Sequence, residues 1–196
     1  MIDRGPLPSP GSVSPDDVLI GTLGRGGRGV FVMPLAIDDS TGAKMQPFPG
    51  ISHAQREIRF SPDGHWVAYT STDSGRPEVY VSPYPGPGER ITISSSGGLD
   101  PVWSRNGREL FYLSVEGRTA GDKMMVVDVQ TGPAFHAERP RVLFQKADVI
   151  GYDVAPDGRF LMIKGLPQAP QVERPSEVHV IVNWIEELRR RVPPIP

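Results

Sequence analysis

A glycine-rich run is the first stretch whose residue types could support chemistry. Residues 24–29 (Gly-Arg-Gly-Gly-Arg-Gly) match the G-x-G-x-x-G pattern, in which backbone amides cover the phosphates of ATP in kinases. No His-Arg-Asp or Asp-Phe-Gly motif follows, and Val30–Met33 is typical of a strand, whereas a dinucleotide-binding loop is followed by a helix. We therefore predict that Gly24–Gly29 is a hairpin turn.

Nucleophilic and metal-binding sites lack essential parts. Gly50–Ala54 approaches the G-x-S-x-G elbow of a hydrolase but has no final glycine. The four histidines show no metal-ligand spacing, and the absence of cysteine excludes thiol nucleophiles, thiolate metal sites and disulfides. We therefore predict that this chain has no catalytic residue, no bound cofactor and no metal ion.

The most regular polar residues are predicted to form turns. Asp63-Gly64, Asn106-Gly107 and Asp157-Gly158 each lie between two apolar runs. Aspartate and asparagine side chains hydrogen-bond the local backbone, and glycine adopts the positive φ that closes a hairpin. A calcium site would need several oxygen ligands, and each turn supplies at most one carboxylate. These six residues are therefore assigned a structural role.

The turns belong to a repeat. Four copies of a polar turn followed by a strongly apolar strand occur, and their anchoring residues lie 43 to 51 residues apart: Asp16, Asp63, Asn106 and Asp157. A period of about 40 to 50 residues with several short strands is typical of a β-propeller blade. The first copy has Asp17 where the other three have glycine, so its turn geometry is not predicted.

The repeat gives a domain organisation for the whole chain. Four blades are expected at about 13–50, 51–97, 98–147 and 148–183. They form a propeller by themselves or belong to a larger one. Residues 1–12 are expected to be a linker or a truncated end. The last blade is expected to end with a strand at Glu177–Asn183 and to lack a fourth strand. A short helix at Trp184–Arg191 is expected within a C-terminal tail, 184–196.

Composition and strand pattern both favour an all-β fold. The 196 residues include 22 glycines and 22 prolines, which fall between apolar runs, and 38% of the residues are hydrophobic. The runs Leu110–Leu113, Met124–Val127 and Phe160–Ile163 are continuously apolar, as in strands that are covered on both faces. Stacked propeller blades provide such cover. The large aromatic residues of the repeats are therefore predicted to pack between blades: Trp66, Tyr69, Tyr80, Trp103 and Tyr112.

Charge and hydropathy argue against two classes of partner. The formal net charge is −2, and the interleaved acids and bases do not predict a nucleic-acid-binding face. No apolar run reaches the roughly 18 residues of a membrane span. Met1–Ser12 is polar and proline-rich, unlike a signal peptide. These observations leave the compartment open.

The repeated Ser-Pro-Asp-Gly units, with Ser74–Val81 and Asp100–Ser104, resemble TolB-like β-propeller repeats. Four further segments are similar to the C-terminal propeller of certain bacterial serine/threonine protein kinases: Tyr84–Gly88, Gly107–Tyr112, Asp122–Met125 and Asn183–Leu188. The resemblance implies a non-catalytic propeller that follows a kinase domain and often a membrane span. It implies an extracytoplasmic location if that kinase is membrane-anchored, and a cytoplasmic one otherwise.

These observations predict a binding or sensing module. Its ligand, a protein or a small molecule, is expected at one end of the propeller axis, where loops converge. The alternative is a regulatory propeller fragment of a serine peptidase of the prolyl-oligopeptidase type, or of a kinase, whose catalytic domain lies elsewhere. An enzyme that acts alone is a third, weaker alternative. Self-association through open terminal blades is also expected, because a bare apolar face tends to associate.

Overall fold

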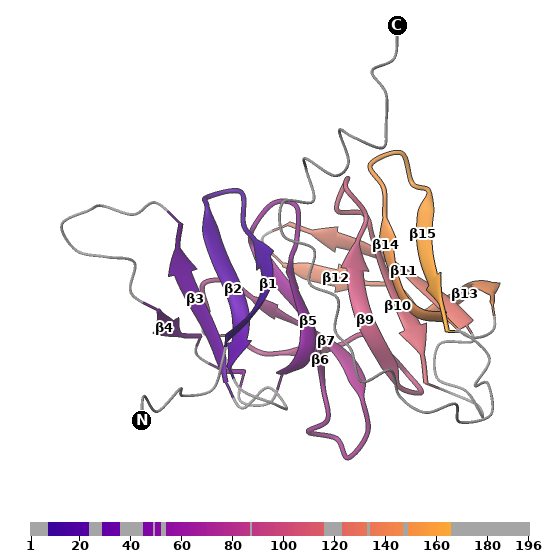
Figure 1. The fold of residues 1–196 in the computed structure, drawn as a ribbon, viewed down its shortest axis with the longest axis horizontal. Helices are drawn as coiled ribbons and strands as arrows, with labels where there is room; N and C mark the ends of the chain where they lie inside the picture. Colours follow the sequence, from indigo (N-terminus) through magenta and orange to yellow (C-terminus); the bar gives the residue numbers. More distant parts are fainter. Residues whose placement is uncertain are drawn as a thin grey trace, which may run out of the picture. The chain divides into compact units, whose positions relative to one another are not determined.

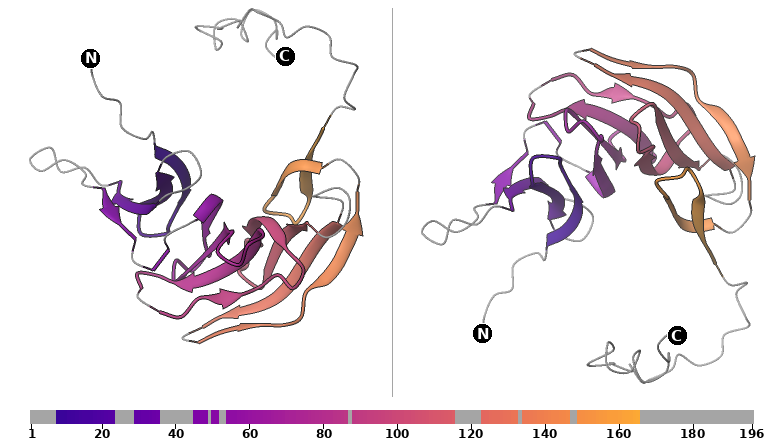
Figure 2. Two further views of the ribbon diagram at one scale, coloured as in Figure 1. Left: turned by 90° about the horizontal axis from the view of Figure 1, so that it is seen from below. Right: turned by 90° about the horizontal axis from the view of Figure 1, so that it is seen from above.

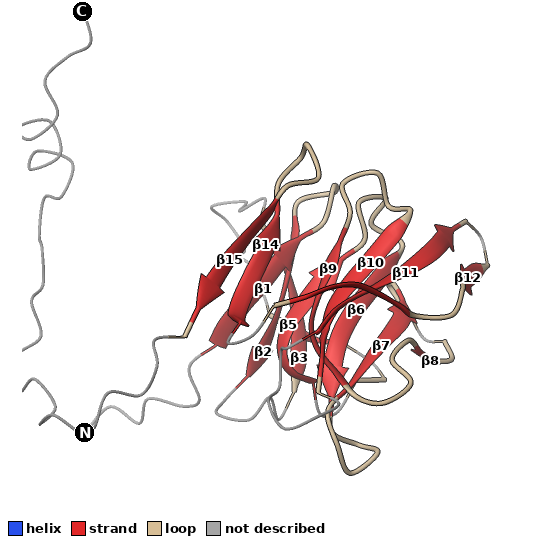
Figure 3. Ribbon diagram, turned by 90° about the vertical axis from the view of Figure 1, so that its right-hand side faces the viewer, coloured by secondary structure: helices blue, strands red, loops and turns tan. Residues whose placement is uncertain are grey.

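The structure is a computed structural model that describes residues 8–23, 29–35, 45–48, 50–51, 54–86, 88–115, 123–132, 134–146 and 149–165. Fifteen β-strands form within these ranges, and no residue in them is helical (Figure 3). The all-β prediction is confirmed for this part of the chain. The expected strand at Glu177–Asn183 and the expected helix at Trp184–Arg191 lie outside the described residues, as does the Gly24–Arg28 part of the glycine-rich run.

The first two antiparallel sheets have four strands each, in sequence order (Figure 1). Sheet 1 consists of β1 (Pro8–Val13), β2 (Val18–Leu23), β3 (Val30–Pro34) and β4 (Gln46–Pro47). Sheet 2 consists of β5 (Ala54–Phe60), β6 (Trp66–Ser71), β7 (Glu78–Pro83) and β8 (Ile91–Thr92). Short neighbouring strands that pair in sequence order are the pattern of a propeller blade.

The next two sheets differ in strand number. Sheet 3 consists of β9 (Gly98–Trp103), β10 (Glu109–Ser114), β11 (Lys123–Thr131), β12 (Phe135–Ala137) and β13 (Arg141–Gln145). Both β12 and β13 pair with β11, at opposite ends of that long strand. In sheet 4 the described residues form β14 (Val149–Val154) and β15 (Phe160–Lys164).

Strand β1 lies in residues that the sequence predicted to be a linker. Its prolines cannot donate to a ladder, but β1 is an edge strand of sheet 1, where this is tolerated. The Ser12 hydroxyl accepts a hydrogen bond from the Phe60 N–H at 2.7 Å, and Gly11 packs so closely on Ile58 that a Cβ would lie 2.5 Å from its Cγ2. Contacts with sheet 2 therefore hold an extended segment that resembles a linker in composition.

Consecutive sheets pack face to face in chain order (Figure 2). Three clusters of buried side chains lie between sheets 1 and 2, 2 and 3, and 3 and 4. Representative residues of the clusters, in that order, are Ile20 and Tyr69; Ala68 and Tyr112; and Phe111 and Phe160. The five aromatic residues that were predicted to pack between blades are all buried in the first two clusters: Trp66, Tyr69, Tyr80, Trp103 and Tyr112.

The turn between the first two strands has two lengths. The residues that flank it are paired as Phe60 with Val67 and Trp103 with Leu110 in sheets 2 and 3. In sheets 1 and 4 the turn is one residue shorter, and the pairs are Val13 with Leu19 and Val154 with Phe160. A shift of one residue moves every side chain of a strand to the other face. An alignment that counts residues from the turn aspartate therefore places β15 one residue out of register with β6 and β10.

The register leaves part of β15 uncovered. Phe160 and Met162 face the core shared with sheet 3, whereas Leu161 and Ile163 are 69% and 58% exposed. The continuous run Phe160–Ile163 was predicted to be covered on both faces, and within the described residues it is covered on one. The reason is that no further described sheet packs on the outer face of sheet 4.

Candidate ligand-binding site

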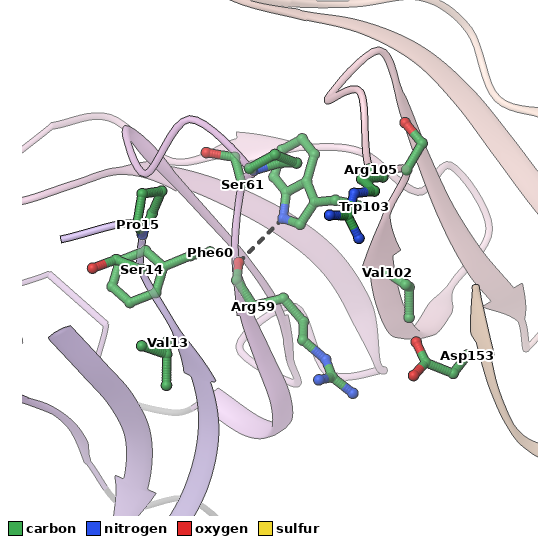
Figure 4. Close-up of a pocket in the computed structure, with 12 residues that line it drawn as sticks. Val13, Ser14, Pro15, Arg59, Phe60, Ser61, Val102, Trp103, Arg105 and Asp153 are labelled. Carbon is green, nitrogen blue, oxygen red and sulfur yellow. Dashed lines mark hydrogen bonds between the residues drawn. The ribbon is translucent and has the colours of Figure 1, made fainter. Parts of the chain in front are cut away.

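The first strand of each sheet contacts the first strand of the next, so that β1, β5, β9 and β14 form a series that we call the inner strands. The ends of these strands, with the turns that follow β1, β5 and β9, border an open pocket of about 380 Å³, which we call the inner-strand pocket (Figure 4). Its walls carry apolar groups from Val13, Phe60 and Trp103, and charged groups from Arg59, Arg105 and Asp153. Cavities of roughly 300–1,000 Å³ accommodate small ligands.

One position of the repeat carries a chemically different side chain in each of the four sheets. The residue before the last residue of each inner strand is, in chain order, Ser12, Arg59, Val102 and Asp153. The last three line the pocket. In β1, β5 and β9 a shift in the pairing register lies next to this position, and such bulges re-aim side chains. In β14 the shift lies nearer the start of the strand, between Val149 and Gly151. This position of the repeat therefore carries a hydroxyl, a cation, an apolar group and an anion in the four sheets.

Arg59 contributes a buried polar atom without a partner. Its Nε is out of contact with solvent and makes no hydrogen bond within the described residues. A buried donor left unsatisfied costs about 1–3 kcal/mol. The backbone of Arg59 is fixed, because its carbonyl accepts a hydrogen bond from the Trp103 indole Nε1 at 3.1 Å. Arg59 lines the pocket, and the terminal N–H groups of its guanidinium are the donors that a ligand oxygen could reach there (Figure 4).

Arg105 brings a second cation to the pocket from the turn of sheet 3. It occupies the position that proline holds in the other three turns, as Pro15, Pro62 and Pro156. Figure 4 shows its side chain and those of Arg59 and Asp153 extending toward the same space. Among the described residues neither arginine forms an ion pair. Two guanidinium groups therefore share the pocket with the single carboxylate of Asp153.

Tyr152 lies next to Asp153 in β14 and packs between sheets 3 and 4. Its hydroxyl donates a hydrogen bond to the Asp100 carbonyl oxygen at 2.7 Å, which links β14 to β9. Removal from water, with the nearby Asp100 carboxylate, raises the pKa of the Tyr152 phenol well above its ordinary value. Tyr152 therefore stays neutral at physiological pH and acts as a hydrogen-bond donor between the two sheets.

The predicted turn residues lie at the ends of the inner strands. Gly64, Gly107 and Gly158 have φ values of 75°, 68° and 82°. Asp17, at the same position of sheet 1, has a φ of 56°, which aspartate tolerates better than most residues. The side chain of Asp157 accepts a hydrogen bond from the Arg159 N–H. The first turn therefore has a positive φ at this position as the other three turns do, although it lacks the glycine.

Asp63 and Asn106 make matching hydrogen bonds in sheets 2 and 3. The Asp63 Oδ1 accepts from the Ser61 hydroxyl at 2.5 Å and from the His65 N–H at 3.1 Å. The Asn106 Oδ1 accepts in the same way from Ser104 and the Arg108 N–H. Burial alone would raise the pKa of Asp63, but the hydrogen bonds from Ser61, Thr131 and His65 outweigh it and lower the pKa.

Other residues that could have supported chemistry are dispersed. His65 is exposed beside its turn, and His136 is exposed on β12, 3.4 Å from the Glu138 carboxylate. His53 and His179 lie outside the described residues. Within the part of the chain that the structure describes, no group of three or more His, Cys, Asp or Glu side chains could hold a metal ion. The described residues also include no helix with the length and apolar character that a membrane span requires.

Sequence reasoning missed the three charged residues of the pocket. Arg105 could have been found, because it is the one departure from proline among the four turns. Arg59 and Asp153 occupy equivalent places just before the turns, so an alignment of the inner strands would have paired them. Their convergence in one pocket depends on how neighbouring inner strands pack, which no local pattern reports.

Comparison with known proteins supports the architecture. No protein-family model matches the chain. One curated protein, from Streptomyces coelicolor and named as a homolog of the tricorn protease, is 29% identical over 150 residues, which span 72% of this chain and 12% of that protein. The chain therefore corresponds to a small part of this relative's length.

Solved structures give the same result at lower identity. A protein from Agrobacterium tumefaciens named as TolB matches with a TM-score of 0.56 and 16% identity, over 84% of this chain and 60% of that chain. A chain of a nidogen/laminin complex matches with a TM-score of 0.57 and 13% identity, over 79% and 55%. The tricorn protease matches with a TM-score of 0.53 and 14% identity, over 89% and 16%. The described part of this chain thus has the TolB-like β-propeller fold, and it spans at most about three fifths of these chains.

Proposed function

We propose that this chain is a ligand-binding segment of a β-propeller that performs no chemistry of its own, and that the inner-strand pocket is its binding site. The observation that carries the proposal is the guanidinium of Arg59, which lines a pocket of about 380 Å³ and whose buried Nε has no partner within the described residues. A buried donor without a partner is costly, and a ligand that binds the same guanidinium would offset part of that cost. Loops and strand ends on a rigid scaffold commonly carry binding residues.

The pocket hydroxyls support a binding role over nucleophilic catalysis. The Ser61 Oγ donates to Asp63 and accepts from the Trp66 N–H, and the Ser104 Oγ donates to Asn106 and accepts from the Glu109 N–H. Activation of a serine requires an adjacent general base such as histidine. These hydroxyls are instead engaged in the turns.

A propeller that serves a peptidase is the best supported setting. The 29% identity to a protein named as a tricorn protease homolog favours it, because that match covers 72% of this chain. In such a setting the pocket would receive a peptide that another domain cleaves. A role beside a kinase domain, which the sequence resemblance implied, stays a prediction, and the reading frame upstream of Met1 tests it.

The binding role is tested with random peptides displayed with free C-termini and selected on the purified chain. We expect enrichment on the natural chain and its loss on Val13→Trp, because Val13 lines the pocket and is 48% exposed, so that a larger side chain fills the cavity. Leu35→Trp is the matched control, since Leu35 is 40% exposed but lies outside the pocket.

The possible outcomes separate the parts of the proposal. Equal enrichment on the natural chain and on Val13→Trp would place binding outside the pocket, and no enrichment would overturn the peptide-binding role. A second assay addresses catalysis with fluorogenic peptides and with ATP plus a generic protein substrate. Peptide hydrolysis or phosphate transfer that co-purifies with the chain would overturn the proposal that the chain performs no chemistry of its own.

A further inference from the structure

We infer that the inner-strand pocket recognises a singly charged carboxylate attached to an apolar group, with Arg59 and Arg105 as the residues that bind it. This inference rests on the proposed binding function and adds the chemical class of the ligand. It draws on three independent features of the pocket, which are the unpaired guanidinium of Arg59, the replacement of proline by Arg105, and the balance of charge.

The first feature is the geometry of Arg59. A guanidinium presents several N–H donors in a planar fork that matches the two oxygens of a carboxylate. The Nε of Arg59 is buried and has no partner within the described residues, and the carbonyl of the same residue is fixed by Trp103. A carboxylate that enters the pocket would bind the terminal N–H groups of this guanidinium, which form no hydrogen bond or ion pair within the described residues.

The second feature is that sheet 3 has an arginine at position 105, where the other three turns have a proline. Pro15 and Pro62 contact the turn glycine of the following sheet: a Cβ on Gly64 would lie 2.9 Å from the Pro15 Cδ, and one on Gly107 would lie 3.7 Å from the Pro62 Cδ. No atom lies within 4 Å of the corresponding position of Gly158. Sheet 3 therefore lacks this contact between turns, and Arg105 places a cation at the pocket instead.

The third feature is the charge of the pocket. Arg59 and Arg105 supply two positive charges and Asp153 one negative charge, so the lining has a net charge of +1. One carboxylate balances it, whereas a dianionic phosphate would leave excess negative charge beside Asp153. The charges thus favour a carboxylate over a phosphate.

The walls indicate what the carboxylate is attached to. Val13, Phe60 and Trp103 line the cavity with apolar surface, and they come from three successive sheets. An aliphatic side chain next to the carboxylate would bury this surface, and exclusion of water strengthens charge-assisted hydrogen bonds. N-acetyl-leucine has this chemistry as a free acid, and a peptide that ends in leucine has it at its C-terminus.

The test is isothermal titration calorimetry of the whole chain with four probes: N-acetyl-leucine, N-acetyl-leucinamide, the tripeptide Ala-Ala-Leu and inorganic phosphate. We expect both acids to bind, the amide to bind at least about tenfold more weakly, and phosphate to bind more weakly than either acid. Tighter binding of the tripeptide would identify a peptide C-terminus as the ligand, and equal binding would identify the free acid.

Four variants assign the binding residues. Arg59→Gln and Arg105→Gln should each weaken binding of the acids at least about tenfold, and Arg59→Lys should weaken it less, because lysine keeps the charge but loses the fork. Arg139→Gln is the matched control, since Arg139 is exposed and does not line the pocket. Arg105 lies in an exposed turn, so its variant serves even if Arg59→Gln fails to fold.

The inference fails separately from the proposed function. Equal binding of the acid and the amide, abolished by Val13→Trp, would keep the pocket as a binding site but overturn carboxylate recognition. Phosphate binding more tightly than the acids would also overturn it, as would unchanged binding by both glutamine variants. No binding of either acid at about 1 mM would overturn it too, whatever the peptide selection gives.

Discussion

Sheets 3 and 4 contain similar second strands that differ in their cover. By register, Phe111 and Leu113 of β10 correspond to Leu161 and Ile163 of β15. The pair in β10 is 5% and 3% exposed, whereas the pair in β15 is 69% and 58% exposed. Both strands are continuous apolar runs in the sequence. An apolar run therefore indicates that a face can be covered, and the neighbouring sheet decides whether it is.

The packing between the two sheets explains the difference. Phe111 and Leu113 lie in the cluster that sheet 4 covers, where the ring of Phe160 meets that of Phe111 edge-on at 5.0 Å. Leu161 and Ile163 point to the opposite side of sheet 4. Within the described residues no sheet lies there. Strand β15 thus covers the outer side chains of β10, while its own outer side chains remain exposed.

The largest effect that separates the two sheets is expected from matched leucine truncations. Leu113→Ala should lower the free energy of unfolding by about 2–5 kcal/mol, because it leaves a cavity in a buried cluster. Leu161→Ala should change it by less than about 0.5 kcal/mol, since the side chain is 69% exposed. Urea denaturation measures both values. Equal losses would show that Leu161 is covered and would contradict the comparison.

The turn glycines give a second, smaller contrast. Gly64→Ala and Gly158→Ala both place a Cβ at positive φ, which costs on the order of 1–3 kcal/mol. Gly64→Ala should cost more, because its Cβ would lie 2.9 Å from the Pro15 Cδ, whereas the site at Gly158 is open. Thermal unfolding of the two variants compares them. A larger loss for Gly158→Ala would show that the contact between the first two turns is unimportant.

Much of the architecture could be predicted from local chemistry. The four repeats gave the sheets and most of their strands, because turn residues and apolar strands report local preferences. The failure at Pro8–Val13 has a physical cause: its prolines favour an extended backbone in a linker and in an edge strand alike. Contacts with sheet 2 distinguish the two, such as the hydrogen bond from the Phe60 N–H to Ser12, which joins residues 48 positions apart.

The pocket could not be predicted in the same way. The turn of sheet 4 is one residue shorter than that of sheet 3, although both contain an Asn-Gly or Asp-Gly pair followed by arginine. A difference of one residue decides which side chains of β15 are covered. The meeting of Arg59, Arg105 and Asp153 likewise depends on the packing of three sheets. Such properties arise from tertiary contacts and leave no periodic pattern.

The hydrogen bond between sheets 3 and 4 should have a smaller effect than the apolar contacts. Tyr152→Phe removes the donor to the Asp100 carbonyl and should cost about 1 kcal/mol at neutral pH. Because the folded state raises the pKa of Tyr152, its contribution is complete below the ordinary phenol pKa near 10 and declines as the pH rises above it. The stability difference between the natural chain and Tyr152→Phe should therefore shrink above pH 10 or so. Denaturation at pH 7 and at higher pH measures it, and a constant difference would contradict the raised pKa.

The smallest effect on stability, and the most direct test of the exposed face, is expected from Leu161→Lys. Leu161 and Ile163 leave exposed apolar surface on the outer face of sheet 4, and such surface favours association. The lysine should leave the free energy of unfolding within about 0.5 kcal/mol and shift sedimentation toward the monomer. Val142→Lys is the control, because Val142 is 46% exposed on β13, in another sheet. A natural chain that is monomeric at every concentration would show that this face does not drive association, and the contrast between sheets 3 and 4 would then concern stability alone.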